Sequence, residues 1–155
     1  MTFLLLKFVH VIGAIVLLGT GAGIAFFMLS AHMSRDVAYI ARTAATVVTA
    51  DFLFTATAVV AQPVSGVLLA REAGLPLGEG WIVWSLALYG IAGAFWLPVV
   101  WIQKALRDMA RVAAANGAPL PERYHRLYRI WFAFGFPAFA AVLAILWLML
   151  TRPDL

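Results

Sequence analysis

After Lys7, His10 is the only ionisable side chain in the first long apolar stretch of the sequence, residues 7–28. An ionisable group within a lipid-spanning helix is costly to keep there, so it indicates a functional site. Gly13 and Gly21 lie on or beside the helical face of His10. An imidazole next to missing side chains suits an axial ligand of a flat b-type haem. The same residues also fit a neutral histidine that is hydrogen-bonded to a neighbouring helix.

Further polar side chains follow one helical face of the second apolar stretch. This face carries Asp51, Thr55, Ala58, Gln62 and Ser65, which recur every three or four residues and are polar except for Ala58. Because lipid offers no hydrogen bonds, we expect this face to look into the helix bundle. Gln62 lies at about the depth of His10, and Pro63 frees a backbone carbonyl about one turn earlier and predicts a kink. The stripe fits a cofactor or substrate pocket, or a structural hydrogen-bonded seam.

The carboxyl group of Asp51 requires either a cation or a proton, because a charge in a medium of low dielectric is unfavourable. Arg129 enters the membrane on the same side, so we predict an Asp51–Arg129 pair that joins two helices. A proton relay through Asp51 is the alternative. The basic cluster that precedes this arginine consists of Arg123, Tyr124, His125 and Arg126. We expect this cluster at the membrane surface, in contact with lipid phosphate. Haem propionates or an anionic substrate are the alternatives.

The composition identifies lipid as the solvent of this chain. Its 155 residues are 65% hydrophobic and only 12% charged, whereas soluble domains carry roughly 25% charged residues. Since the chain has no cysteine, disulfides, iron–sulfur clusters, thiolate zinc sites and c-type haem are excluded. The net charge of the chain is +4. In a membrane protein such an excess of Lys and Arg is typical of the cytoplasmic loops, so we expect no nucleic acid partner.

Four stretches are long and apolar enough to span a bilayer as helices. They cover about residues 3–29, 43–70, 81–102 (extending to about 115) and 123–150. We therefore predict an all-α membrane protein, a four-transmembrane-helix bundle that forms one domain over residues 1–155. Most Lys and Arg residues lie in the first and third connections, which predicts that these face the cytoplasm. Both termini are then on the outer, periplasmic side of a bacterial inner membrane.

Four stretches across the chain carry a resemblance to a known family: KFVHVIGAIVLLGTGAGIAFFM, DFLFTATAVVAQP, WLPVVWIQ and RYHRLYRIWF. They resemble domain of unknown function 2269, a bacterial family of predicted integral membrane proteins without an established activity. Shorter pieces are Lys7-x-x-His10, Gly80-Trp81, Tyr128-Arg129 and Arg152-Pro153. These are similar to the HemJ-type protoporphyrinogen oxidases, and the resemblance implies haem b bound by His10. Ser85 stands where that family has an important lysine, so oxidase activity is not implied.

Three functions therefore remain open from the sequence. The first is a b-haem-binding redox protein in which His10 binds the iron, Gly13 and Gly21 make room for the ring, and Gln62 forms a hydrogen bond nearby. The second is a non-enzymatic membrane subunit or assembly partner, which pairs with a second copy or with another membrane protein. The third is a small transporter that uses the stripe from Asp51 to Gln62 as a polar path. No catalytic residue is assigned.

Overall fold

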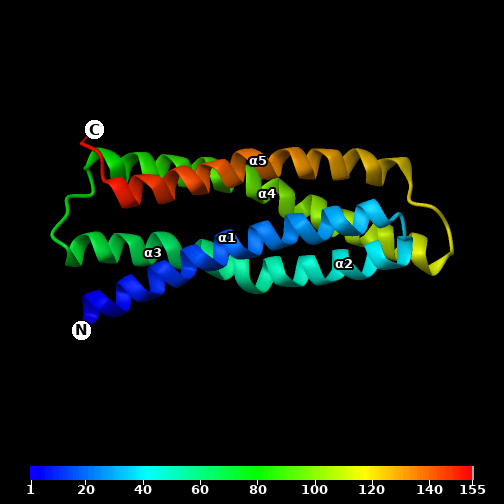
Figure 1. Cartoon of the computed structure of the whole chain (residues 1–155), viewed down its shortest axis with the longest axis horizontal. Helices are drawn as coiled ribbons and strands as arrows, with labels where there is room; N and C mark the ends of the chain where they lie inside the picture. The colour runs from blue at the N-terminus through cyan, green and yellow to red at the C-terminus, as the bar shows by residue number, and fades with distance from the viewer. Residues whose placement is uncertain (155) are drawn as a thin grey trace.

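The computed structural model describes residues 1–154 and is helical almost throughout. Its elements are α1 (Thr2–Ser34), α2 (Val37–Ala50), the π-helix η1 (Asp51–Thr55), α3 (Ala56–Glu72), α4 (Gly80–Ala115) and α5 (Glu122–Thr151). Since α2, η1 and α3 follow one another without a break, the chain forms four long rods, each long and apolar enough to cross a membrane (Figure 1). The predicted all-α fold with four membrane-spanning helices is confirmed.

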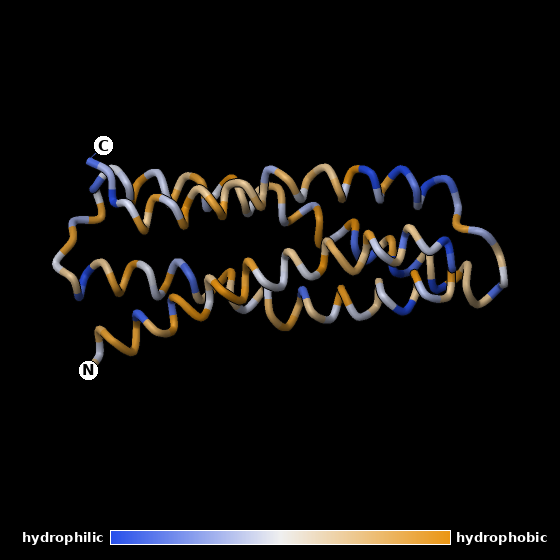
Figure 2. The backbone as a smooth tube through the Cα atoms, viewed as in Figure 1, coloured by the Kyte–Doolittle hydropathy of each residue, from blue (hydrophilic) through white to orange (hydrophobic). Residues whose placement is uncertain are grey.

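Both termini lie at one end of the bundle (Figure 1). The α1–α2 turn and the loop of residues 116–121 lie at the opposite end, which we call the basic end. Hydrophilic residues gather there, whereas the rest of the rods is mostly apolar (Figure 2). The first and third connections thus lie at the same end of the bundle, as predicted. The side of the membrane that each end faces stays a prediction.

The helices pack differently in the two halves of the bundle. Over the whole length α4 runs against α5, and α1 contacts first α3 and then α2. The buried hydrophobic cluster joins all four rods, but only in the half nearer the basic end: Ile24, Met28, Ala31, Ile40, Ala44, Val47, Val99, Leu106, Ala110, Tyr124, Tyr128 and Trp131. In the other half the rods associate mainly as the pairs α1–α3 and α4–α5. The apolar core therefore belongs to the basic half.

The turn between α1 and α2 is shorter than the predicted connection of residues 30–42. Arg35 adopts a left-handed conformation with φ 58° and ends α1. Asp36 then caps α2, because its side chain accepts hydrogen bonds from the backbone N–H groups of Ala38 and Tyr39. An aspartate at this position satisfies two otherwise unpaired donors and starts a helix at once. The second rod consequently begins about six residues earlier than the hydropathy alone indicates.

The third rod continues well past the apolar stretch that ends near residue 102. Helix α4 continues to Ala115, and Asn116 and Gly117 end it. Gly117 has a φ of 59°, the left-handed geometry that glycine tolerates without strain. The following loop leads to Glu122, where α5 begins. Helices α4 and α5 therefore form an antiparallel pair that packs side by side.

Candidate functional site

The polar stripe of the second rod faces the interior of the bundle, as predicted. Its members are 5–8% exposed: Asp51, Thr55, Ala58, Gln62 and Ser65. The predicted effect of Pro63 is also present, because the carbonyl of Val59, four residues earlier, lacks its helical donor. The hydroxyl of Tyr89 on α4 donates to that oxygen instead. We call this inward-facing row of residues the polar seam.

His10 is held against the polar seam by two hydrogen bonds. Its Nδ1 lies 2.9 Å from Ser65 Oγ, and Gln62 Nε2 donates to the His10 backbone carbonyl over 2.7 Å. The Ser65 hydroxyl donates its only proton to the carbonyl of Ala61, at 2.7 Å. Ser65 must therefore accept from His10, which assigns the imidazole proton to Nδ1 and leaves a lone pair on Nε2.

The glycines near His10 have different roles from the predicted one. A Cβ atom at Gly13 would collide with the side-chain amide of Gln62. On the facing helix, a Cβ at Gly66 would lie 3.2 Å from His10 Cε1. Gly13 therefore makes room for Gln62 and not for a flat ring, which corrects its predicted role. Gly21 is open, since an added Cβ would meet no other atom within 4 Å.

Asp51 lies at the first position of η1 and is 5% exposed. Trp96 Nε1 donates to its Oδ1 over 3.3 Å. Gln103 Nε2 donates to its Oδ2 over 3.2 Å when the amide is oriented so that its oxygen accepts from Trp131 Nε1, also at 3.2 Å. Because an indole N–H can only donate, Trp131 fixes this orientation of Gln103. Both carboxyl oxygens thus meet neutral donors from α4.

The predicted Asp51–Arg129 pair is not formed, and this expectation was wrong. Arg129 is exposed, and within residues 1–154 the structure contains one salt bridge, between Arg107 and Asp108 at 2.8 Å. The reason is the rotation of α5, whose buried face is set by large aromatic residues at helical spacing. Arg129 lies outside that face, on the exposed surface of the bundle.

The predicted basic cluster divides into two parts. Arg123 and Arg126 are exposed at the basic end, as expected of a membrane-surface cluster. His125 is half-buried, and Tyr124 is fully buried, so the expectation that Tyr124 lies at the surface was wrong. A tyrosine buries far more apolar area than an arginine, which explains why it takes the inward position.

The buried aromatic residues of α5 surround His32, near the end of α1. The His32 ring stacks on Tyr128 with a centroid distance of 3.9 Å and an interplanar angle of 8°. It lies 6.1 Å from the Tyr124 ring and 5.8 Å from the His125 ring. On the other side Tyr128 lies 5.8 Å from Trp131, which bonds Gln103. A row of polar-tipped rings therefore leads from the basic end to the donors of Asp51.

Several buried polar atoms in this region have no hydrogen-bond partner within the described part of the chain. They are His32 Nδ1, Thr55 Oγ1, and the hydroxyl oxygens of Tyr124 and Tyr128. Buried polar groups are nearly always paired, so such a group indicates a bound water, an ion or a functional role. Sequence reasoning missed these aromatic contacts, although the spacing of Tyr124, Tyr128 and Trp131 marks one helical face.

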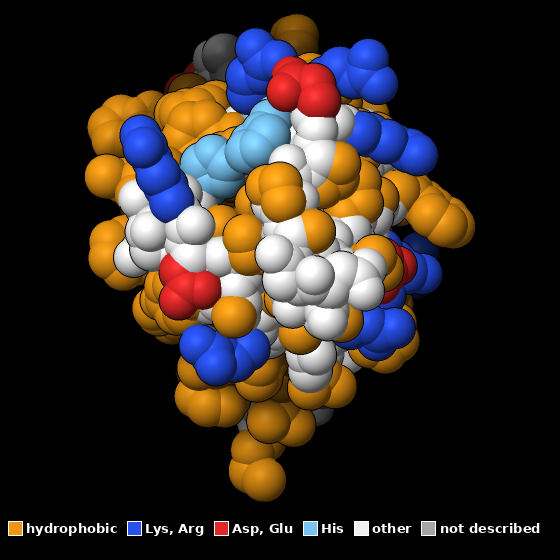
Figure 3. Space-filling model, turned by 90° about the vertical axis from the view of Figure 1, so that its right-hand side faces the viewer, with side chains coloured by type: hydrophobic (Ala, Val, Ile, Leu, Met, Phe, Trp, Pro, Cys, Tyr) orange, Lys and Arg blue, Asp and Glu red, His pale blue; other side chains and the backbone are white. Residues whose placement is uncertain are grey.

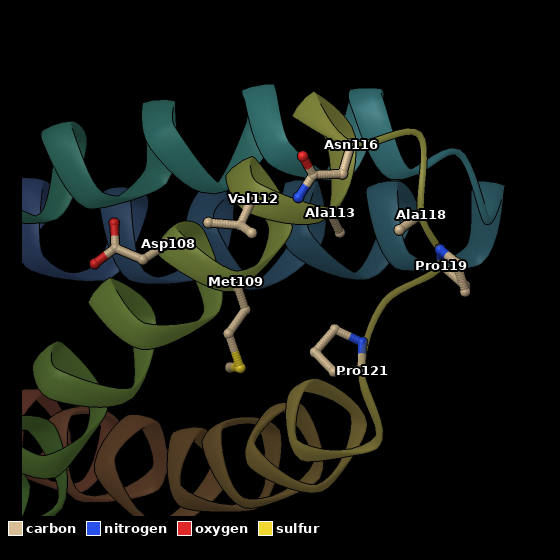
Figure 4. Close-up of a pocket in the computed structure, with 8 residues that line it drawn as sticks. All are labelled: Asp108, Met109, Val112, Ala113, Asn116, Ala118, Pro119 and Pro121. Atoms are coloured by element: carbon tan, nitrogen blue, oxygen red, sulfur yellow. The ribbon is translucent and has the colours of Figure 1, made fainter.

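Cavities open at the basic end. One of about 580 Å³ is lined by residues of α1, α2, α5 and the preceding loop, including His32 and His125. Another of about 430 Å³ lies where α4 meets the loop to α5, and in Figure 4 Met109 and Pro121 face each other across it. The second cavity has mainly apolar walls and contains no group that points to chemistry.

Four long apolar helices around a buried polar seam define this chain as an integral membrane protein. It belongs to the family described as predicted integral membrane protein, domain of unknown function 2269, whose sequence model matches residues 4–153. No curated protein and no solved structure is significantly similar to the chain. The weaker resemblance to the HemJ-type oxidases is therefore not shown by these comparisons, and the family membership itself assigns no activity.

Proposed function

We propose that this protein is a small transporter of the bacterial inner membrane in which Asp51 binds and releases a proton. The observation that carries the proposal is the environment of Asp51. The carboxyl group is buried, and its partners are the neutral groups of Trp96 and Gln103. Two neutral donors offset only part of the cost of a buried charge, so the site can hold the neutral acid as well as the anion. An Arg-paired carboxyl group would instead stay ionised.

The backbone at Asp51 supports the same assignment. Residues Asp51–Thr55 form a π-helix, in which the N–H of Ala56 bonds to the carbonyl of Asp51. Single π-helical turns are rare and are found frequently at functional sites. A helix that only anchored the bundle would gain stability from regular α-helical bonding. The π-turn therefore favours a working carboxyl group over a structural one.

We infer that protons reach Asp51 from the basic end, where His125 and His32 lie. The Tyr128 ring stacks on His32 and lies beside Trp131, which bonds Gln103. Because an indole and an amide donate hydrogen bonds without exchanging protons, the last step to Asp51 requires water. The unpaired hydroxyl of Tyr128 and Nδ1 of His32 can bind water that bridges the steps. Under the positive-inside rule the basic end faces the cytoplasm, so Asp51 would exchange protons with that side.

Beyond Asp51 the polar seam is interrupted. Between Thr55 and Gln62 the inward face carries Ala58, a gap of roughly 10 Å along the helix. Gln62, Ser65 and His10 then continue the seam towards the termini. A proton held at Asp51 crosses this gap only when water enters or the helices move. This separation suits a carrier that exposes Asp51 to one side at a time, and not an open channel.

Proton flux into vesicles tests the proposal. The purified protein is reconstituted into liposomes with a trapped pH dye, and a potassium diffusion potential is imposed with valinomycin. We expect the Asp51→Asn variant to fall to the rate of protein-free vesicles. Asp108→Asn is the matched control, because this aspartate is exposed and paired with Arg107 at the basic end. Equal flux through the wild type and Asp51→Asn would refute the transport role.

Infrared spectroscopy supplies an independent readout of the same group. The neutral form of Asp51 gives a carbonyl stretching band of a protonated carboxylic acid, which Asp51→Asn removes and Asp108→Asn retains. A band that persists in Asp51→Asn would assign the proton to another residue. Since this measurement needs no transport, it separates a proton-binding Asp51 from a defect in reconstitution.

A haem b bound by His10 is the second candidate. Its support is the bond between Ser65 and Nδ1, since a metal-binding histidine usually holds its other ring nitrogen in a hydrogen bond. The surroundings fit less well, because Gln62 fills the space beside Gly13 and bonds the His10 carbonyl. A Soret band that disappears in His10→Ala would establish haem binding. Colourless protein from haem-replete cells would exclude it.

A further inference from the structure

The cavity of about 580 Å³ at the basic end combines one arginine and two histidines with apolar walls. Arg35 from the α1–α2 turn, His32 from α1 and His125 from α5 line it. Ile40 and Leu120 supply apolar surface on the neighbouring walls. In Figure 3, which looks onto this end, histidine side chains lie side by side with Lys and Arg side chains around them. The lining thus fits an anion that carries an apolar part.

The polar groups of the cavity wall are largely left free by the described part of the chain. Within residues 1–154 Arg35 takes part in no salt bridge. The adjacent Asp36 uses its carboxylate to cap α2, and the ring of His125 lies 5.8 Å from that of His32. His32 Nδ1 is buried without a partner in the described structure. Buried polar atoms without a protein partner are rare unless they form a hydrogen bond to water or to a ligand.

The backbone of Arg35 provides a further observation. Arg35 and Arg152 are the described non-glycine residues with positive φ, at 58° and 42°. Glycine is the usual residue at this helix-ending position, because a side chain there is strained. Arg35 is also one of the residues that line the cavity. Arginine is the side chain best suited to bind phosphate oxygens in a planar, two-pronged geometry.

We propose that this cavity binds a phosphate group through Arg35, His32 and His125. The phosphate belongs either to the headgroup of an anionic phospholipid or to a free phosphate ion. The apolar walls and the location at the water-facing end of the helices favour the lipid, whose acyl chains would follow the exposed helix surface. This site lies apart from Asp51 but shares His32 and His125 with the proposed proton route. Its test measures phosphate binding alone and requires no proton transport, so the two proposals can fail separately.

Ligand-induced thermal stabilisation of the full chain in neutral detergent tests the proposal. The probes are dihexanoyl phosphatidylglycerol, inorganic phosphate, and dihexanoylglycerol, which has the same chains without a phosphate. Stabilisation by phosphatidylglycerol alone assigns the site to a lipid headgroup. Equal stabilisation by inorganic phosphate assigns it to the free ion. Stabilisation by neither, or an equal effect of dihexanoylglycerol, would overturn the proposal.

The decisive variant is Arg35→Gly, which removes the guanidinium group at a position where glycine relieves strain. We expect the variant to fold normally and to bind the phosphate probe roughly tenfold more weakly. Arg152→Gly is the matched control, because it relieves the same kind of strain at the opposite end. His125→Gln should also weaken binding while it keeps a polar side chain. Wild-type affinity in Arg35→Gly would contradict the assignment.

Discussion

The contact between Gly13 and Gln62 gives the sharpest test of how the polar seam is built. In Gly13→Ala the new methyl group would collide with the Gln62 amide, which must then leave the His10 carbonyl. A buried amide that loses its partner costs about 1–3 kcal/mol, which includes the lost hydrogen bond. The helix regains about 1 kcal/mol because alanine is a better helix former than glycine. We therefore expect a net loss of up to about 2 kcal/mol.

Unfolding of the purified protein in detergent, followed by circular dichroism, measures this loss. Gly21→Ala is the control, because its methyl group meets no atom within 4 Å, and it should be neutral or slightly stabilising. The double variant Gly13→Ala, Gln62→Ala should be no less stable than Gln62→Ala alone, since the collision has been removed. If Gly13→Ala destabilises both backgrounds equally, the glycine makes room for something other than Gln62, and the reasoning fails.

Two further predictions concern the ends and the interior of the second rod. Asp36→Ala removes the cap of α2 and should cost about 0.5–2 kcal/mol of stability, whereas Asp36→Asn, which keeps an acceptor, should cost much less in the same unfolding assay. Tyr89→Phe leaves the Val59 carbonyl without a donor and should cost about 1–3 kcal/mol. In a Pro63→Ala background the restored helical N–H satisfies that carbonyl, so the cost of Tyr89→Phe should largely disappear; an unchanged cost would contradict the role of Pro63.

The elements that depend on local sequence were predictable. Helix spans follow from hydropathy, the end of α4 follows from Asn116 and Gly117, and the inward face of the polar seam follows from its helical spacing. The early start of α2 was also encoded locally, by Asp36, but the basic residues around it concealed the helix from a hydropathy criterion. In each case the physical cause acts within a few residues.

The partners across helices were not predictable in the same way. The choice of Trp96 and Gln103 over Arg129 as neighbours of Asp51 depends on how α4 and α5 rotate about their axes. That rotation is set by the burial of aromatic residues on α5, a property of the whole interface. The filling of the Gly13 space by Gln62 is likewise a tertiary effect, since both a haem ring and an amide fit the same glycine spacing.

The π-turn at residues Asp51–Thr55 also connects the two parts of the seam mechanically. A π-turn contains one residue more than the α-helical turn it replaces. If it reset to α-helical bonding, α3 would rotate by roughly 100° relative to α2 and advance by about 1.5 Å. Gln62 and Ser65 would then swing away from His10, although neither touches Asp51. The hydrogen bonds of His10 to Ser65 and Gln62 therefore depend on the backbone conformation at Asp51, about one half of the bilayer away.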